Sequence, residues 1–88
     1  MKFNYSKKFV KQFKKLPESL KDAFETRLRL FVVDKYNPIL KNHRLKGDYK
    51  GCQSLNISGD FRLIFQSDEE NGIMLLIEIG DHHQLYGK

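Results

Sequence analysis

The residues best suited to acid–base chemistry in this sequence are its three histidines. His82 and His83 are adjacent and follow the apolar segment 73–79 after Gly80 and Asp81, whereas His43 lies in a polar stretch near the middle of the chain. Histidine side chains exchange protons near neutral pH, so all three are candidates for general acid–base catalysis. An isolated histidine is more often a surface residue, so a catalytic role requires other reactive groups at the same place.

The elements that must position these residues follow from hydrophobic periodicity. Segment 2–5 alternates apolar and polar residues, which predicts a short strand, and Ser6 suits a helix N-cap. Apolar residues at helical spacing predict one helix up to Leu16, and a second helix from Pro17 to Tyr36, where Asn37-Pro38 stops it.

The remainder of the chain is β-like. A short strand is expected around Arg44–Lys46, followed by three strands over 52–58, 61–66 and 73–80 that turn residues separate. Helices that precede a run of antiparallel strands predict a two-layer α+β domain. We therefore expect one domain over residues 1–88, with a helical hairpin packed on an antiparallel β-sheet.

The apolar pattern predicts the register of the first hairpin. Leu55 and Ile57 both face the helices if they pair with Leu63 and Phe61, through a three-residue loop over 58–60. A two-residue turn would pair Ile57 with the following arginine and spoil this pattern.

This register has a consequence for the candidate site. Asn56 and Arg62 become neighbours on the face away from the helices, with Asp60 at the hairpin tip. The last strand then delivers His82 to the same end of the sheet, so an arginine, a carboxylate and an imidazole are predicted to meet there. Arg62 could also form a purely structural ion pair with Glu78 across the sheet.

The composition limits the possible partners. The chain has a net charge of +5, and residues 1–50 hold fourteen Lys or Arg and five Asp or Glu, a net +9. Residues 51–88 carry two basic and six acidic residues, a net −4. The basic half favours a polyanionic partner, although the lysines of segment 7–15 could simply form a solvated helix face.

The sequence also indicates a compartment. The first residues contain no secretory signal, no stretch is long enough to cross a membrane, and the lone Cys52 cannot form an internal disulfide. These features predict a cytoplasmic protein in which Cys52 is a small buried hydrophobe. The spacing of the histidines is not typical of a metal site, so no metal or other cofactor is expected.

Four stretches together resemble the RelE/YafQ family of toxins from bacterial type II toxin–antitoxin modules. In order, they read H-x-L-x-G at 43–47, K-G at 50–51, G-D-x-R-L-I-F at 59–65 and G-x-H-x-x-L-Y at 80–86. No single stretch is specific, but all four occur in the family's order in a short basic chain. The two N-terminal helices and the following sheet are similar to the family as well.

The resemblance implies an mRNA interferase, a metal-independent endoribonuclease that cleaves mRNA on the 70S ribosome and stops translation. It also implies a cognate antitoxin that holds the toxin inactive in a hetero-oligomer. By matched position, the implied catalytic residues are His43, Asp60, Arg62, His82 and Tyr86, and Arg44, Lys46 and Lys50 would line the RNA path. His82 would be a general acid or base, with Arg62 stabilising charge on the phosphate.

One position departs from the family pattern. Asn56 stands where YafQ-like sequences often carry a further histidine, and an asparagine cannot shuttle protons near neutral pH. His43 and His82 could suffice for catalysis, His83 could compensate for the missing histidine, or the catalytic activity could be weak. We assign the role to His82 rather than His83 because its spacing matches the motif, and adjacent residues of a strand point in opposite directions.

Two rival functions use the same scaffold. The first is a ParE-like inhibitor of DNA gyrase, against which the predicted cluster of His43, Asp60 and His82 argues. The second is a catalytically weak toxin that only binds its antitoxin. An apolar cluster of Ile64, Met74 and Leu76 is expected on the outer sheet face, where a C-terminal segment could partly cover it or an antitoxin could pack.

Overall fold

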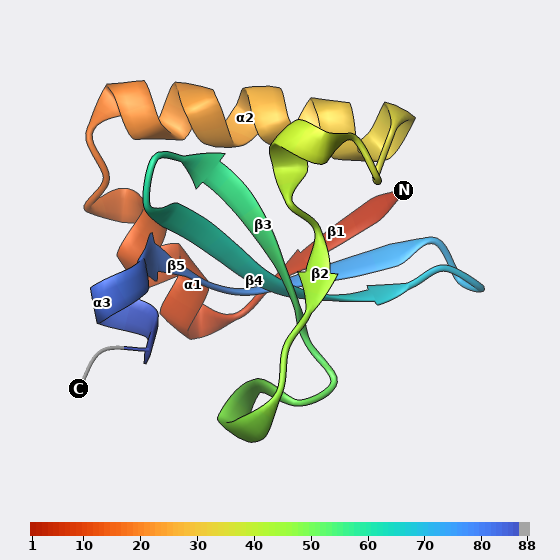
Figure 1. The fold of residues 1–88 in the computed structure, drawn as a ribbon. Helices are drawn as coiled ribbons and strands as arrows, with labels where there is room; N and C mark the ends of the chain where they lie inside the picture. The colour runs from red at the N-terminus through yellow and green to blue at the C-terminus, as the bar shows by residue number, and fades with distance from the viewer. Residues whose placement is uncertain (87–88) are drawn as a thin grey trace.

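The computed structural model describes residues 1–86, which form a five-stranded sheet and three α-helices (Figure 1). The elements in chain order are β1 (Lys2–Tyr5), α1 (Lys7–Lys14), α2 (Glu18–Val33), the 3₁₀ turn η1 (Pro38–Leu40), β2 (His43–Arg44), the 3₁₀ turn η2 (Gly47–Tyr49), β3 (Gln53–Ser58), β4 (Phe61–Asp68), β5 (Ile73–Asp81) and α3 (His82–Tyr86). None of the helices in this part of the chain has the length and apolar character that crossing a membrane requires.

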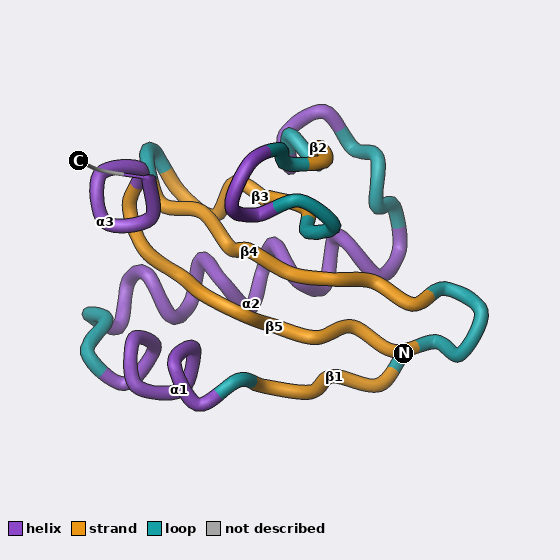
Figure 2. The backbone as a smooth tube through the Cα atoms, turned by 90° about the horizontal axis from the view of Figure 1, so that it is seen from below, coloured by secondary structure: helices purple, strands orange, loops and turns teal. Residues whose placement is uncertain are grey.

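The sheet has the strand order β1-β5-β4-β3-β2, which Figure 2 shows from the side opposite α2. Strands β2, β3, β4 and β5 pair antiparallel with one another in that order, as expected. Strand β1 instead runs parallel to β5, so the sheet is mixed rather than wholly antiparallel. The helices between β1 and the rest of the sheet allow this parallel pairing, because parallel strands need a long crossover connection. The predicted α+β class is confirmed.

Ser6 connects the first helix to the sheet. Its Oγ accepts a hydrogen bond from the Phe9 amide at 2.9 Å, which confirms the predicted N-cap, and donates one to the Ile77 carbonyl at 2.6 Å. Helix α2 follows Pro17 as predicted but ends at Val33, three residues before Tyr36. Helix α2 lies across one face of the sheet (Figure 1).

The main core lies between the two N-terminal helices and the sheet. The helical side and η1 contribute Phe9, Phe24, Phe31 and Leu40, and the strands contribute Leu55, Ile57, Leu63, Phe65, Met74, Leu76 and Ile79. Phe31 packs edge-on against Phe65, with ring centroids 5.3 Å apart. Strands β3, β4 and β5 are therefore held against the helices by this core.

The hairpin of β3 and β4 differs from its predicted register at one end. Leu55 pairs with Leu63 as expected, but Ser58, not Ile57, pairs with Phe61. The loop therefore has only two residues, and Gly59 takes a positive φ of 51° in it. Ile57 forms a β-bulge, and this extra residue lets it stay in the core at 1% exposure despite the shorter loop.

A second bulge reverses the facing expected for β5. Ile64 pairs with Glu78 and Phe65 pairs with Leu76, so Ile77 is the extra residue. The inward residues of β5 are consequently Met74, Leu76 and Ile79. Simple two-residue alternation along this strand predicts that Ile73, Leu75, Ile77 and Ile79 point inward, and this prediction is wrong except for Ile79. A bulge breaks strict alternation, so no two-residue repeat fits the whole strand.

The outer face of the sheet carries a smaller apolar cluster that is covered, not exposed. Ile64, Cys52 and Leu85 are buried there, and Leu45, Tyr49, Ile77 and Tyr86 pack around them. The covering residues come from segment 45–51 and from α3. Of the three residues expected on this face, Ile64 does lie there and is covered by the C-terminal helix, whereas Met74 and Leu76 belong to the main core instead, so their expected outward position is wrong. Cys52 is a buried hydrophobe, as predicted.

Candidate functional site

The C-terminal end of β5 turns directly into α3 through a capping box. The Gln84 amide donates to Asp81 Oδ1 at 2.7 Å, and the Asp81 amide donates to Gln84 Oε1 at 2.9 Å. This reciprocal pairing satisfies two amides that the first turn of a helix would leave without partners. The sequence D-x-x-Q at 81–84 is the local signal for this turn, and the sequence analysis missed it.

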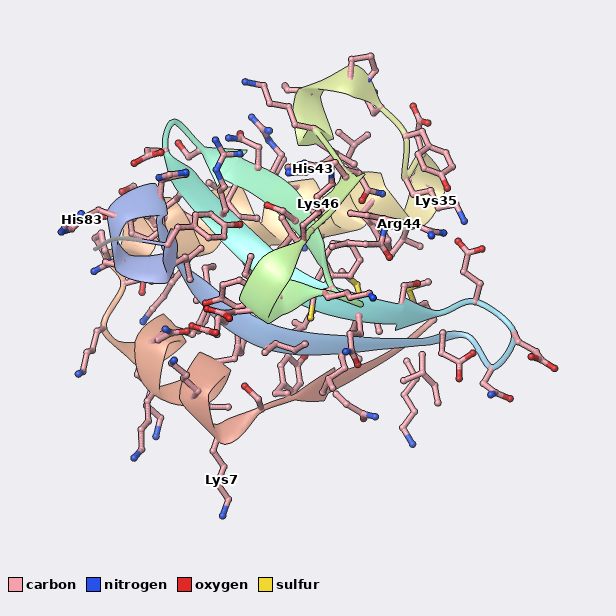
Figure 3. The ribbon with its side chains drawn as sticks, turned by 60° about the horizontal axis from the view of Figure 1, so that its bottom comes forward. Lys7, Lys35, His43, Arg44, Lys46 and His83 are labelled. Atoms are coloured by element: carbon pink, nitrogen blue, oxygen red, sulfur yellow. The ribbon has the colours of Figure 1, made fainter. Side chains whose placement is uncertain are left out.

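The helix determines which way the histidines point. His82 and His83 are the first two residues of α3 rather than the last residues of a strand. His82 and Tyr86 lie one helical turn apart, with ring centroids separated by 4.7 Å. His83 is exposed and projects from the side of α3 that faces away from His43 (Figure 3).

Asp60 contacts the start of the same helix. Its Oδ2 accepts a hydrogen bond from the His82 backbone amide at 3.3 Å. The carboxylate therefore lies at the N-terminus of α3, where the unpaired amides of the helix favour a negative charge. This hydrogen bond is made with the backbone of His82 and not with its imidazole.

Arg62 extends from the outer face of β4 beside this cluster. It pairs with Asn56 on one side, as predicted, and with Gly80 on the other, two residues before His82. Within residues 1–86, its guanidinium forms no ion pair and no side-chain hydrogen bond. The structural bridge from Arg62 to Glu78 is absent there, because Glu78 pairs with Lys8 at 3.1 Å.

Asn56, which replaces the family's further histidine, has a structural role. Its side-chain amide donates to the Gly59 carbonyl at 2.9 Å, and its Oδ1 accepts from Arg27 of α2 at 3.3 Å. The Arg27 guanidinium also donates to the Ile39 carbonyl at 2.9 Å. Asn56 therefore ties the β3–β4 turn to α2, and its side chain is 7% exposed.

His43 lies on the same sheet face, two strands from Arg62. It pairs with Ser54 on β3, and Ser54 pairs with Ile64 on β4. Two strand spacings and two residues along a strand separate the Cα atoms of His43 and Arg62 by about 12 Å. Asp60 thus contacts the His82 amide, His82 contacts Tyr86, and the backbone of Arg62 pairs two residues before His82, while His43 lies across the same face.

The backbone around His43 selects its tautomer. His43 Nδ1 lies 2.7 Å from the carbonyl of Lys41, and since a carbonyl only accepts, Nδ1–H must be the donor. Lys41 adopts a left-handed conformation with φ 49°, which turns this carbonyl toward the ring. In the neutral ring, Nε2 then keeps its lone pair and is available as a proton acceptor.

The predicted RNA-path cations divide between two places. Lys46 lines a cleft of about 350 Å³ together with Tyr49 and Tyr86, so it belongs to the end of the sheet with His82. Arg44 and Lys50 line a cleft of about 460 Å³ nearer the other end of β4. Figure 3 shows His43, Arg44 and Lys46 following one another along β2 and the segment after it, away from Lys7 on α1.

Tyr49 is a component that the sequence analysis did not identify. Its hydroxyl lies 2.9 Å from Glu78 Oε2 and 3.1 Å from the Leu85 carbonyl, and its ring packs edge-on against Tyr86 at 5.6 Å. Burial, followed by the hydrogen bond to Glu78, raises the pKa of Tyr49 to about 12. No sequence signal marks this contact, because it joins a loop residue to partners 29 and 36 positions away.

In the part of the chain that the structure describes, no group of three or more His, Cys, Asp and Glu side chains is arranged to hold a metal ion. The polar side chains carried by the neighbouring backbone positions 60, 62, 82 and 86 are a carboxylate, a guanidinium, an imidazole and a phenol. This set can transfer protons and bind an anion.

Comparison with known proteins identifies the family. Residues 1–87 match the family model described as the bacterial toxin of type II toxin–antitoxin system, YafQ. None of the curated proteins matches this sequence significantly.

Solved toxin structures have the same fold. The crystal structure of YafQ from E. coli superposes with a TM-score of 0.81 at 19% identity, covering 97% of each chain. The E. coli DinJ–YafQ toxin–antitoxin complex gives a TM-score of 0.78 at 20% identity, covering 97% of this chain and 96% of the other. A copper-bound mutant toxin from Helicobacter pylori gives a TM-score of 0.72 at 26% identity, covering 97% and 98%.

The fold and the family match together define a bacterial toxin of a type II toxin–antitoxin system. Within that class, the chain belongs to the YafQ family of the RelE/YafQ toxins. This confirms the resemblance that the four sequence motifs indicated.

Proposed function

We propose that this toxin is an mRNA interferase, an endoribonuclease that cleaves mRNA on the ribosome and thereby stops translation. The observation that carries the proposal is Arg62, whose guanidinium lacks an ion-pair partner within residues 1–86 and whose backbone pairs with Gly80, two residues before His82. A guanidinium without an ion-pair partner suits bidentate contact with phosphate oxygens.

The reaction uses the nucleophile that RNA itself carries. The 2′-oxygen attacks the adjacent phosphorus, its proton passes to a base, and the P–O5′ bond breaks as an acid protonates the departing oxygen. The products are a 2′,3′-cyclic phosphate and a 5′-hydroxyl. Arg62 stabilises the negative charge that develops on the phosphoryl oxygens. The step needs no metal ion, because the two proton transfers and the charge stabilisation all come from side chains.

The positions of the two histidines support separate roles. Nε2 of His43 is free to accept the 2′-hydroxyl proton, because Nδ1–H is engaged by the Lys41 carbonyl. His82 supplies the proton to the 5′-oxygen, with its backbone oriented by Asp60. Tyr86 stacks beside His82 and offers an aromatic face to a base near the cut. Lys46 extends the cationic surface for the RNA backbone at this end, and Arg44 and Lys50 extend it toward the far end of β4.

The partner follows from the class of the protein. A toxin of a type II module is controlled by a cognate antitoxin, and a solved complex of E. coli YafQ contains DinJ. We propose that this chain likewise forms a hetero-oligomer with an antitoxin encoded beside it, in the cytoplasm.

Primer extension on cellular mRNA after induction of the chain tests the proposal. Wild type should produce cuts at defined positions within reading frames and arrest growth, whereas His82→Ala should do neither and still bind the antitoxin. Intact mRNA together with stalled replication would instead support the gyrase inhibitor. A fully toxic H82A variant would refute the role of His82.

A further inference from the structure

We propose that Tyr49 and Glu78 clamp α3 to the sheet and act as positioning residues for His82 and Tyr86, an inference that rests on the proposed function. Helix α3 has only five residues, and isolated helices of that length do not form in water. Its position must therefore come from contacts with the rest of the chain, and Tyr49 supplies contacts from a distant segment.

The hydroxyl of Tyr49 bridges two elements. It donates its proton toward Glu78 Oε2 on β5 at 2.9 Å. The Leu85 carbonyl of α3 also lies 3.1 Å from the Tyr49 hydroxyl oxygen. Since the hydroxyl has one proton and both partners only accept, this is a shared hydrogen bond whose stronger partner is the charged carboxylate. The ring of Tyr49 then packs edge-on against Tyr86, so one residue contacts α3 through both its hydroxyl and its ring.

Glu78 fixes the other end of the clamp. Its side chain is 11% exposed, and its second oxygen, Oε1, forms an ion pair with Lys8 of α1 at 3.1 Å. A carboxylate this buried needs such partners to remain charged. With one oxygen held by Lys8 and the other by Tyr49, Glu78 connects α1, β5, segment 45–51 and α3 in a single network.

Tyr86 connects this network to His82, which lies one helical turn earlier in α3. Tyr86 touches Tyr49 on one side and the imidazole of His82 on the other, at centroid distances of 5.6 Å and 4.7 Å. Movement of Tyr86 therefore moves the surface against which His82 rests. A catalytic imidazole displaced by about 1 Å loses up to about a hundredfold in rate.

The test compares wild type with Tyr49→Phe, which removes only the hydroxyl, and uses Tyr5→Phe as the matched control. Tyr5 is 55% exposed on β1 and stacks on Phe9, away from α3. Single-turnover cleavage of ribosome-bound mRNA is measured as a function of toxin concentration, and amide hydrogen exchange of Tyr86 is followed by NMR.

Y49F should lower the maximal rate about ten- to a hundredfold with a half-saturating concentration within about twofold of wild type. The Tyr86 amide should exchange about five- to tenfold faster, as expected for one lost hydrogen bond. Y5F should change neither quantity. A wild-type rate for Y49F, or a raised half-saturating concentration with an unchanged rate, would overturn the inference.

Glu78→Gln is the second variant, because glutamine keeps an acceptor oxygen but loses the charge. Its rate should fall less than that of Y49F, and the double variant should be no slower than Y49F alone, since both residues act in one network. Additive losses would contradict the clamp. If wild type does not cleave RNA, the proposed function fails, and the exchange rate alone then decides the clamp: faster exchange in Y49F supports it and unchanged exchange refutes it.

Discussion

Substitution of Gly80 by alanine should reduce catalysis with little effect on global stability. A Cβ at this position would lie 2.9 Å from Gln84 Oε1 and 3.3 Å from Gln84 Cβ, closer than side chains tolerate. Because Oε1 is the end of a flexible side chain, Gln84 can rotate away, and the hydrogen bond from the Asp81 amide is then lost. Loss of a capping interaction costs about 0.5–2 kcal/mol.

Two opposing effects set the change in the free energy of unfolding. Replacing glycine by alanine restricts the unfolded chain and stabilises the protein by about 0.4–1 kcal/mol, provided that the backbone accepts a side chain. Gly80 does not have a positive φ, unlike Gly47, Gly51, Gly59 and Gly72, so the backbone does accept one. The free energy of unfolding in urea should therefore fall by no more than about 1.6 kcal/mol. Cleavage should fall at least about tenfold, because the displaced first turn carries His82.

Gln84→Ala is the control, since it removes the same hydrogen bond without crowding. It should lower cleavage to a similar extent, and the double variant should be no worse than either single one. Full activity in G80A, or a loss in the double variant equal to the sum of the two, would refute the claim that the capping box positions His82.

Three further predictions follow from the packing and charges of the site. The raised pKa of Tyr49 means that its stabilising contribution is complete below pH 10, the ordinary value, and is lost as pH rises through about 12. Because Tyr49 is only partly buried, the loss should be of order 1 kcal/mol, measured as the difference between wild type and Y49F in urea unfolding at pH 9 and pH 11. Arg62→Lys should lower the rate of cleavage about a hundredfold or more. It should leave the free energy of unfolding unchanged, since the guanidinium has no ion pair within residues 1–86 to lose. A variant with full activity would exclude bidentate phosphate contact. Phe65→Ala should destabilise the fold by about 3–5 kcal/mol in urea or thermal unfolding, because Phe65 has 0% exposure and packs against Phe31; a loss below 1 kcal/mol would contradict the assigned core.

Local patterns in the sequence predicted the features that depend on neighbouring residues. The Ser6 cap, the break at Pro17 and the pairing of Leu55 with Leu63 all follow from short-range periodicity or capping. The parallel pairing of β1 with β5 was not predictable in this way, because its partner lies about seventy residues away and a four-residue strand carries no directional signal.

The two β-bulges explain why the alternation of side chains along a strand did not predict every inward residue of β5 or the loop between β3 and β4. Each inserts one residue, at Ile57 and at Ile77, and the choice of position depends on contacts with the neighbouring strand and on the core. Helix α3 was missed for a different reason. Five residues are too few for helical periodicity, and only the pairing of Asp81 with Gln84 indicates it.

The sequence predicted which residues lie near one another in the candidate site better than it predicted their side-chain contacts. The backbone positions of Asp60, Arg62 and His82 lie near one another at one end of the sheet, and the catalytic roles of their side chains stay a prediction. The contact of Asp60 with a backbone amide, the tautomer of His43 and the network around Glu78 could not be predicted, because each depends on side-chain geometry between distant segments.

The central claim is that the RNA supplies its own nucleophile, and the ends of the cut RNA test it most directly. A ribosome-bound mRNA should be cleaved by the wild-type toxin to give a 2′,3′-cyclic phosphate and a 5′-hydroxyl, and a single 2′-deoxy substitution at the cut position should abolish cleavage there. A product with a 5′-phosphate, or continued cleavage at the deoxy-substituted position, would contradict the account.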